Sequence, residues 1–180
     1  MSQFHLIAEN VWRIRVVPNC MLAYQNVEVS LHLPSTWRGT RSMIAYVTVG
    51  ADDMARAKQF YSAFLPALDY GLKEGPEGLS YALPIQPGQS VILPDFYVKP
   101  TFDGYPASAG NGTMIAFEAR SQKQVRDLHA AALAAGGFDE GQPGFRPSYG
   151  PHFYVAYLRD PQGNKIALFS SDPNEPGRDG

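Results

Sequence analysis

The strongest constraint on the fold is an internal repeat, in which one strand, one helix and three further strands occur twice. In the first copy, the apolar run 44–50 precedes Asp53, a residue type that caps helix N-termini by accepting hydrogen bonds from exposed amides. In the second copy, the run 113–119 precedes Ser121, another capping residue. An offset of 71 residues superposes two identical Met-Ile-Ala triplets but loses the caps. An offset of 68 residues matches the caps and the apolar stripes of both helices, and we adopt it.

The first predicted helix has apolar residues at helical spacing, and Pro66 is expected to end or kink its last turn. Three strands are predicted next, near 70–74, 79–84 and 90–98, with Gly and Pro between them. A Gly/Pro/Ser-rich loop, 99–112, then leads to the second copy. The apolar stripe of the first helix comprises Met54, Ala57, Phe60, Tyr61, Phe64, Leu65 and Leu68.

The second predicted helix ends at a Gly-Gly pair, a strong C-terminal stop. A long loop, 138–151, is expected to lead to the strands 152–159 and 164–171, which form a hairpin. The turn between them reads Asp-Pro-Gln-Gly from Asp160. In such a turn Pro presets φ, Gly accepts a positive φ, and the Asp carboxylate accepts backbone hydrogen bonds. The stripe of the second helix comprises Val125, Leu128, His129, Ala132 and Leu133.

Both ends of the chain are less regular than the repeat. Residues 1–42 contain two alternating segments, 11–17 and 26–33, each followed by a proline. These segments are expected to form a marginal hairpin laid on the domain or a disordered arm. Because Met43 stands where the regular part begins, a third interpretation is an upstream extension of the reading frame that is not native to the protein. The tail 172–180 is charged and rich in Pro and Gly, and is expected to be frayed.

The composition excludes several classes of function. With 180 residues, 44% of them hydrophobic, the chain is long enough to bury a sizeable core. Its formal net charge is -2 with both signs mixed along the sequence, so it lacks the basic stripe that nucleic-acid binding requires. No apolar run is long enough to span a membrane, and the start of the chain lacks the features of a secretory signal. Cys20 is the single cysteine, which excludes an internal disulfide, and we expect a cytoplasmic protein.

In their order and spacing, three fragments resemble the vicinal oxygen chelate superfamily, which includes glyoxalase I, bleomycin-resistance proteins and extradiol dioxygenases. The fragments are VTVGADDMARAKQFY after the first strand, GNGTMIAFEA at the start of the second copy and RDPQGNKI in the terminal hairpin. The resemblance covers 43–171, with modules at 43–98 and 113–171. It implies an α+β fold of two βαβββ modules whose mixed sheets form a cup, with helices outside and a ligand or metal inside. It also implies a homodimer, since members commonly join such sheets across chains.

In metal-dependent members, side chains from the first and last strands of each module hold the ion. The resemblance places the two positions that usually carry His on Tyr46 and Met114, and the terminal Glu on Ala167. The fourth position falls on Ile92 or Asp95. A methyl group has no donor atom, a thioether suits soft metals, and a phenol ionises at a cost at neutral pH. We therefore predict no metal at the family site and no other cofactor.

Alternation along the strands predicts what lines the cup instead. If Tyr46 and Met114 face inward, so do Thr48, Glu118 and Lys165, while the apolar residues between them face the helices. Glu118 and Lys165 are expected to form an ion pair at one rim. An apolar cup with few polar groups suits a small, partly aromatic organic ligand. The predicted ligand-binding residues are Tyr46, Thr48, Phe96, Met114, Glu118, Arg146, Tyr149, His152, Lys165 and Ala167.

The sequence leaves two possible roles open for several of these residues. His152 is either an acid–base residue or a structural one. Arg146 and Tyr149 either cover the cavity and bind an anionic group or belong to a solvated loop. Phe96 and Tyr97 either stack on a ligand or lie in a dimer interface. No catalytic residue is assigned.

The favoured hypothesis is metal-independent binding or sequestration of a small organic molecule by a protein of the bleomycin-resistance kind. A second hypothesis is an enzyme, either a lyase or isomerase of the lactoylglutathione lyase kind or a dioxygenase, with a metal held by residues such as Asp95, His152 or Glu118. A third hypothesis is a degenerate scaffold that acts through protein contacts. The sequence leaves open whether the protein is an enzyme.

Overall fold

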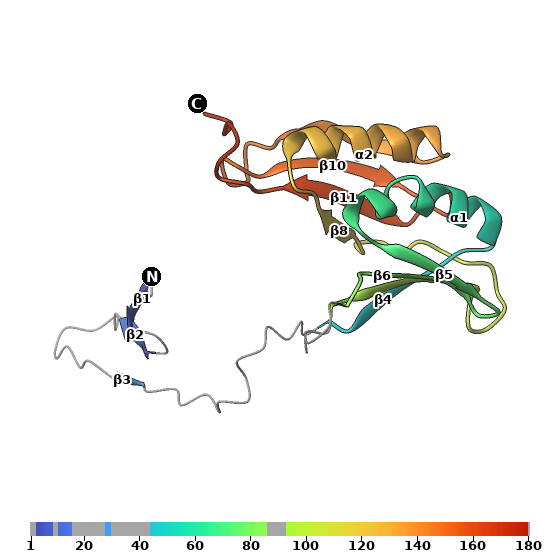
Figure 1. Cartoon of the computed structure of the whole chain (residues 1–180), viewed down its shortest axis with the longest axis horizontal. Coiled ribbons are helices and arrows are strands. Elements are labelled where there is room, and N and C mark those ends of the chain that lie inside the picture. Colours follow the sequence, from blue (N-terminus) through green and yellow to red (C-terminus); the bar gives the residue numbers. More distant parts are fainter. Residues whose placement is uncertain (1–2, 9–10, 16–27, 30–43, 86–92, 180) are drawn as a thin grey trace. The chain divides into compact units, whose positions relative to one another are not determined.

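A computed structural model describes residues 3–8, 11–15, 28–29, 44–85 and 93–179 of the chain (Figure 1). The chain divides into two compact units, Met1–Arg41 and Ser42–Gly180. In the first unit three strands form an antiparallel sheet in the order β1-β2-β3, and the pairing of β2 with β3 joins the two segments predicted to form a hairpin. Strand β1 has no counterpart among the predicted strands. The bounds are β1 Gln3–Ala8, β2 Val11–Arg15 and β3 Glu28–Val29.

The second unit begins with a βαβββ module whose sheet has the order β4-β7-β6-β5. Its first strand lies parallel to its last, as the crossover through a helix requires. The predicted helix ends before Pro66, which lies in a short 3-10 helix, as the sequence indicated. The bounds are β4 Tyr46–Gly50, α1 Met54–Ser62, η2 Leu65–Leu68, β5 Gly71–Gly75, β6 Gly78–Ala82 and β7 Asp95–Lys99.

The second module repeats this plan, with a sheet in the order β8-β11-β10-β9 and β8 parallel to β11. Its bounds are β8 Ile115–Glu118, α2 Gln122–Ala134, β9 Phe138–Phe145, β10 Tyr154–Arg159 and β11 Lys165–Ser170. The loop predicted at 138–151 is wrong in its first half, which is strand β9. Proline and glycine are tolerated there because β9 is an edge strand whose pairing with β10 has register shifts.

The two helices begin where the sequence places their caps. The Asp53 carboxylate accepts a hydrogen bond from the Arg56 amide at 2.9 Å, and the Ser121 hydroxyl accepts one from the Gln124 amide at 3.1 Å. The caps lie 68 residues apart, so the adopted offset of the repeat is confirmed. Helix α1 packs on β6 and β7, and α2 packs on β9, β10 and β11 (Figure 1). Each sheet therefore has one face covered by a helix and one open face.

One hydrophobic core joins the modules. Phe60 and Tyr61 from α1, and Phe64 from the turn between α1 and η2, are fully buried. Tyr61 lies 4.9 Å from Phe96 of β7, and Phe64 lies 5.9 Å from Phe117 of β8, between ring centroids. Phe96 and Phe117 also contact each other, with ring centroids 5.4 Å apart, so aromatic rings from both sheets pack in one core.

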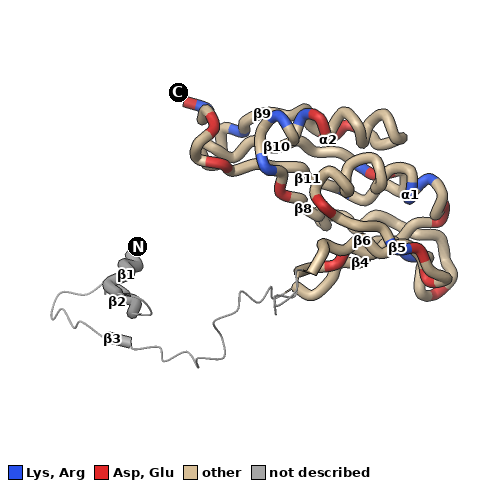
Figure 2. The backbone as a smooth tube through the Cα atoms, viewed as in Figure 1, with Lys and Arg blue, Asp and Glu red and all other residues tan. Residues whose placement is uncertain are grey.

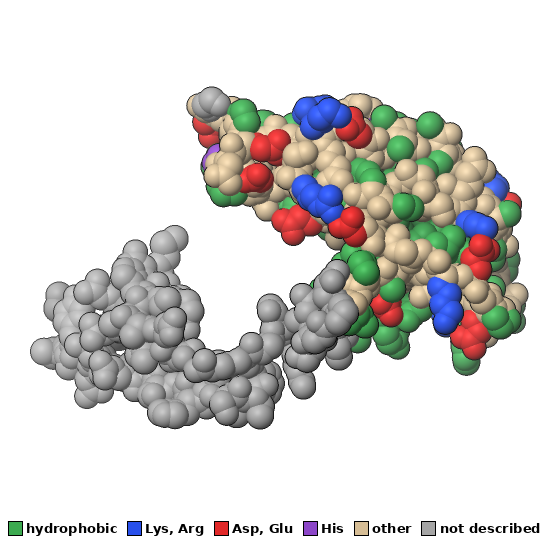
Figure 3. Space-filling model, in the orientation of Figure 1, with side chains coloured by type: hydrophobic (Ala, Val, Ile, Leu, Met, Phe, Trp, Pro, Cys, Tyr) green, Lys and Arg blue, Asp and Glu red, His purple; other side chains and the backbone are tan. Residues whose placement is uncertain are grey.

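Charges of both signs are interspersed over the second unit. Lys and Arg alternate with Asp and Glu along its backbone (Figure 2), and cations lie beside carboxylates on the face seen in Figure 3. Neither α1 nor α2, the α-helices of the described residues, has the length and apolarity needed to cross a membrane. The described surface thus shows no single-sign stripe in these views.

The buried carboxylate of Asp160 connects the two modules. Its side chain is 1% exposed and accepts hydrogen bonds from the Tyr61 hydroxyl at 2.7 Å and from the Gln162 and Asn164 amides at 2.9 and 2.8 Å. A fourth bond comes from the Asn164 side-chain amide at 2.9 Å, which also donates to the Gly50 carbonyl of β4. Asp160 is therefore the turn residue that the sequence predicts. Its hydrogen bonds also connect the β10–β11 hairpin to the first module.

Replacing Asp160 with Ala is expected to lower the free energy of unfolding by about 3 kcal/mol, because four donors lose a buried acceptor. Tyr61→Phe removes one donor only and is expected to cost about 1 kcal/mol. Urea unfolding of the full chain, followed by circular dichroism, measures both changes. Asp127→Ala is the matched control, since it removes an exposed carboxylate paired with Lys123 and should cost less than about 0.5 kcal/mol. Equal losses of unfolding free energy in Asp160→Ala and Asp127→Ala would contradict the stabilising role of the buried Asp160 carboxylate.

Candidate ligand-binding site

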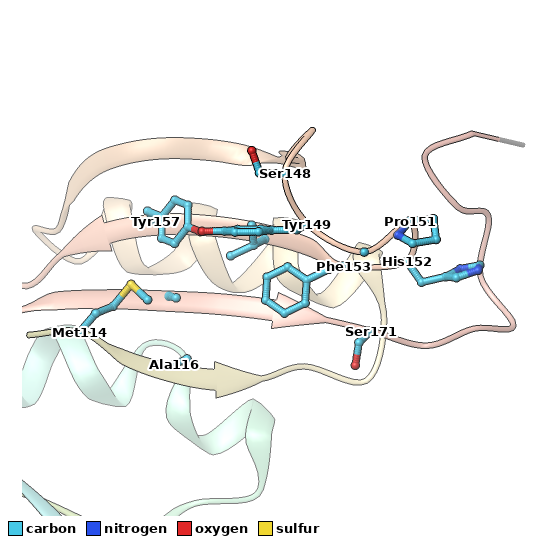
Figure 4. Close-up of a pocket in the computed structure, with 12 residues that line it drawn as sticks. Met114, Ala116, Ser148, Tyr149, Pro151, His152, Phe153, Tyr157 and Ser171 are labelled. Atoms are coloured by element: carbon cyan, nitrogen blue, oxygen red, sulfur yellow. The ribbon is translucent and has the colours of Figure 1, made fainter. Parts of the chain in front are cut away.

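A cavity of about 640 Å³ lies on the open face of the second module (Figure 4). Its floor comes from β8, β10 and β11, and its wall comes from the loop 148–153 that precedes β10. The lining is mostly apolar. It consists of Met114, Ala116, Ser148, Tyr149, Gly150, Pro151, His152, Phe153, Val155, Tyr157, Ala167 and Ser171.

Strand alternation creates this floor. In β8, Ala116 is exposed while Phe117 is buried, so the two side chains point to opposite faces of the sheet. Tyr157 pairs with Ala167 across β10 and β11, and both line the cavity. The two alanines leave the space that a larger side chain would fill. At one end, Phe153 stacks on Phe169 with ring centroids 5.0 Å apart.

Two tyrosines provide the polar groups nearest the middle of the cavity. The Tyr157 hydroxyl donates to the Tyr149 hydroxyl at 3.3 Å, and the two meet in Figure 4. Desolvation and the hydrogen bond with Tyr149 raise the pKa of Tyr157 to about 12. Tyr157 is therefore a neutral hydroxyl at physiological pH and offers a ligand hydrogen bonding without charge.

The C-terminal tail holds the wall of the cavity in place. The Arg178 guanidinium donates to the carbonyls of Arg146, Pro147 and Tyr149 at 3.0–3.2 Å, and the Arg178 amide donates to Pro151 at 2.8 Å. These bonds attach Arg178 to the loop, and the fraying expected for 172–180 stays a prediction. The sequence could not show these contacts of Arg178, because the carbonyls that bind it lie about thirty residues away along the chain.

A second attachment of the tail lies at the start of α2. The Glu175 carboxylate accepts from the Gln122 amide at 2.7 Å, near the positive end of the helix dipole. The Gln122 side chain in turn donates to the Pro176 carbonyl at 2.7 Å. The tail is thus bound at both the loop and the helix.

Four predicted ligand-binding residues line the cavity, namely Met114, Tyr149, His152 and Ala167. The imidazole of His152 points toward the tail rather than into the cavity (Figure 4). Its Nδ1 is buried and has no hydrogen-bond partner among the described residues. The lining also includes Ser148, Phe153, Val155, Tyr157 and Ser171, which the prediction missed. Alternation applied to the strand 152–159 would have found Tyr157.

Three predicted residues lie in the first module instead. Tyr46 is 63% exposed on the open face of β4, where its ring lies edge-on to Tyr97 at 5.6 Å, and Thr48 shares that face. Phe96 is 2% exposed and packs in the core, because it points to the helix side of β7 while Asp95 and Tyr97 point away. It also lies in the lining of a second, smaller cavity, and its role as a ligand-stacking or interface residue stays a prediction.

The predicted ion pair between Glu118 and Lys165 does not form. The parallel register places Glu118 beside Phe169, four residues along β11 from Lys165, or about 13 Å at the usual rise of a strand. Lys165 pairs with Glu140 of β9 at 3.2 Å, and Glu118 accepts from the Ser171 hydroxyl at 3.4 Å. Arg146 is not among the lining residues: its guanidinium donates to the carbonyls of nearby residues and stacks on the ring of Tyr157, which does line the cavity.

A smaller cavity of about 270 Å³ lies at the seam between β4 and β8, the edge strands of the two sheets. Met114 and Ala116 line this cavity as well as the larger one. Asp95 lies at its rim, where its carboxylate accepts from the Tyr97 hydroxyl at 2.9 Å. The side chain of Met114 is thus shared by two neighbouring hollows.

The donors at the family's metal positions do not fit a divalent ion. Tyr46 and Met114 offer a phenol and a thioether, and Ala167 offers no donor atom. Two residues are candidates for the fourth position. The Asp95 carboxylate accepts a hydrogen bond from the Tyr97 hydroxyl, and Ile92 lies outside the described residues. Within the described parts of the chain, no three His, Cys, Asp or Glu side chains gather to hold a metal.

Paired βαβββ modules, each with a helix on one face of a mixed sheet, define a glyoxalase-like α+β protein. Residues 43–168 match the Glyoxalase/Bleomycin resistance protein/Dioxygenase superfamily. The chain therefore belongs to this superfamily, which confirms the resemblance seen in the sequence.

Solved structures agree with this assignment. A glyoxalase/bleomycin resistance protein from Albidiferax ferrireducens is 36% identical, with a TM-score of 0.62 over 73% of this chain and 100% of its own. A glyoxalase-related enzyme from Fulvimarina pelagi is 19% identical, with a TM-score of 0.52 over 71% of this chain and 86% of its own. A family enzyme from Burkholderia phytofirmans is 20% identical, with a TM-score of 0.52 over 71% and 98%. The latter two show the fold alone. None of the curated proteins matches the sequence significantly.

Replacing Arg178 with Ala is expected to loosen the cavity wall, because three carbonyls lose a charged donor. Such a loss corresponds to roughly tenfold faster amide exchange in 146–153. Hydrogen–deuterium exchange of the full chain, resolved by peptide, measures the change. Arg120→Ala removes another exposed Arg, paired with Asp69 away from this loop, and should leave the exchange of 146–153 unchanged. Unaltered exchange in Arg178→Ala would contradict the role of the tail.

Raising the pH is expected to destabilise the fold between pH 10 and about 12. The folded state raises the pKa of Tyr157 to about 12, through desolvation and its hydrogen bond, whereas an unfolded phenol ionises near about 10. The stabilisation is therefore complete below pH 10 and lost as the pH rises through the folded value. Urea unfolding at several pH values measures the free energy of unfolding. This energy should fall less steeply with pH in Tyr157→Phe than in the wild-type protein. An unchanged decline in that variant would contradict the assignment.

Proposed function

We propose that the protein binds small, partly aromatic organic molecules without a metal, as a binding or sequestering member of its superfamily. The observation that carries this proposal is the cavity of about 640 Å³, a size typical of ligand sites. Its lining combines apolar side chains with few polar groups, chiefly the hydroxyls of Tyr149, Tyr157 and two serines. Such a surface favours a ring with one or two hydrogen-bonding groups.

The chemistry of the open face supports binding rather than metal-dependent turnover. Met114 and Ala167, two of the residues at metal positions of the family, line this cavity with a thioether and a methyl group. The candidates for a non-standard site are dispersed: Asp95 binds Tyr97, Glu118 contacts Ser171, and His152 points toward the tail. A homodimer and a cytoplasmic location stay predictions from the sequence and the family resemblance.

Filling the cavity is expected to abolish binding. Ala116→Trp places an indole on the exposed floor of the cavity, away from the core, so it should remove the effect of 2-naphthamide on thermal stability. In the wild-type protein, this probe at 100 times its dissociation constant should stabilise the fold by about 2.7 kcal/mol. Differential scanning calorimetry of the full chain measures both values.

Thr48→Trp is the matched control, because Thr48 is exposed on the open face of the first module, 68 residues before Ala116. It should retain the wild-type response. Binding that survives Ala116→Trp but not Thr48→Trp would move the site to the first module. No response to any aromatic probe would favour the scaffold hypothesis, and a tightly bound stoichiometric metal in purified protein would favour the enzyme hypothesis.

A further inference from the structure

Three cations and one carboxylate gather around Tyr157. The Arg146 guanidinium and the Lys165 ammonium each lie 5.3 Å from the centroid of its ring. Lys165 and Arg159 share the carboxylate of Glu140, the first at 3.2 Å. The group therefore carries a net charge of two positive units.

The charge of Arg146 is not neutralised by an acid. Its guanidinium donates to the carbonyls of Gln142, Gly144 and Phe145 at 2.9–3.3 Å. No ion pair of Arg146 occurs within the described parts of the chain. Carbonyl oxygens orient the guanidinium but leave its unit charge in place. This positive charge therefore lies next to the Tyr157 ring that lines the cavity.

Strand register sets the cations at one end of the cavity. Arg159 of β10 pairs with Lys165 of β11. Tyr157, two residues before Arg159, pairs with Ala167, two residues after Lys165. Lys165 precedes Ile166, which pairs with Ile115, so the start of β11 lies beside Met114. The cavity is lined by Met114, Tyr157 and Ala167, so the cationic group borders this end.

The opposite end of the cavity is aromatic and lies near an acid. Phe153 and Phe169 stack there, and Tyr149 packs edge-on to Phe153 at 5.3 Å. Glu118 lies beside Phe169, about 13 Å along the strand from Lys165. The cationic group therefore lies at the Lys165 end of β11, and the Glu118 carboxylate lies near the other end.

We propose that the cavity takes small aromatic anions, with the ring between Met114 and Phe153 and the anionic group directed toward Lys165 and Arg146. This inference rests on the proposed function and adds the class of ligand. The alanines of the floor leave room for a flat ring, and Phe153 offers an aromatic contact (Figure 4). The Tyr149 and Tyr157 hydroxyls provide neutral donors beside the anionic group, and the raised pKa of Tyr157 keeps its proton in place.

Three probes of one shape test this inference: 2-naphthoate, 2-naphthamide and 2-naphthylmethylammonium. Isothermal titration of the full chain at 50 mM salt should show 2-naphthoate binding about tenfold tighter than the amide, with the ammonium weakest. The preference for 2-naphthoate over 2-naphthamide should decrease as salt is raised to 500 mM, because Lys165 is partly exposed and its charge is screened.

Lys165→Met should bring the ratio of the dissociation constants of 2-naphthamide and 2-naphthoate toward one. Lys123→Met is the matched control, since Lys123 is exposed on α2 and pairs with Asp127 on the helix side of the sheet. It should keep the wild-type ratio. Circular dichroism and the melting temperature verify that both variants are folded.

Each outcome separates the two proposals. Equal affinity for 2-naphthoate and 2-naphthamide, or tighter binding of the ammonium, would overturn the anionic class while leaving small-molecule binding intact. A preference for 2-naphthoate that survives both Lys165→Met and Arg146→Met would also overturn it. If none of the three probes binds, the proposed function fails together with the inference.

Discussion

The buried carboxylate of Asp160 is the contact on which the arrangement of the two modules depends. One of its oxygens binds the amides of its own turn, and the other binds the Tyr61 hydroxyl of α1 and the side chain of Asn164. Asn164 continues the link to the Gly50 carbonyl. Burying a carboxylate is costly unless donors replace its water, so the four bonds make this position specific. The hairpin that it holds provides β10 and β11, on which the cavity stands.

The two open faces differ although the modules repeat one plan. Thr48 and Ala116 occupy matching positions in β4 and β8. Over the second module, a loop crosses the face and Arg178 binds that loop through three carbonyls. Over the first module, Tyr46 remains 63% exposed. A concave site needs a wall as well as a floor, and in the second module the loop 148–153, held by Arg178 of the tail, provides that wall.

The sequence predicts those features whose partners are close along the chain. The caps at Asp53 and Ser121 and the turn at Asp160 involve amides two to four residues away, and all three are confirmed. The alternation of buried and exposed residues in β4 and β8 is likewise a local property. The family and the α+β fold could therefore be predicted.

Features that depend on strand register or on distant segments could not be predicted in this way. Whether Lys165 meets Glu118 or Glu140 depends on which strands neighbour β11, and alternation alone does not determine that. Because the second sheet carries its core on one face and the cavity on the other, a residue such as Met114 can change without disturbing Phe117 beneath the helix. The fold can thus keep its core while the side chains of the open face vary. If the cavity binds small molecules as proposed, the side chains of the open face, in particular the charges around Tyr157, determine which ligand it takes, and the fold does not.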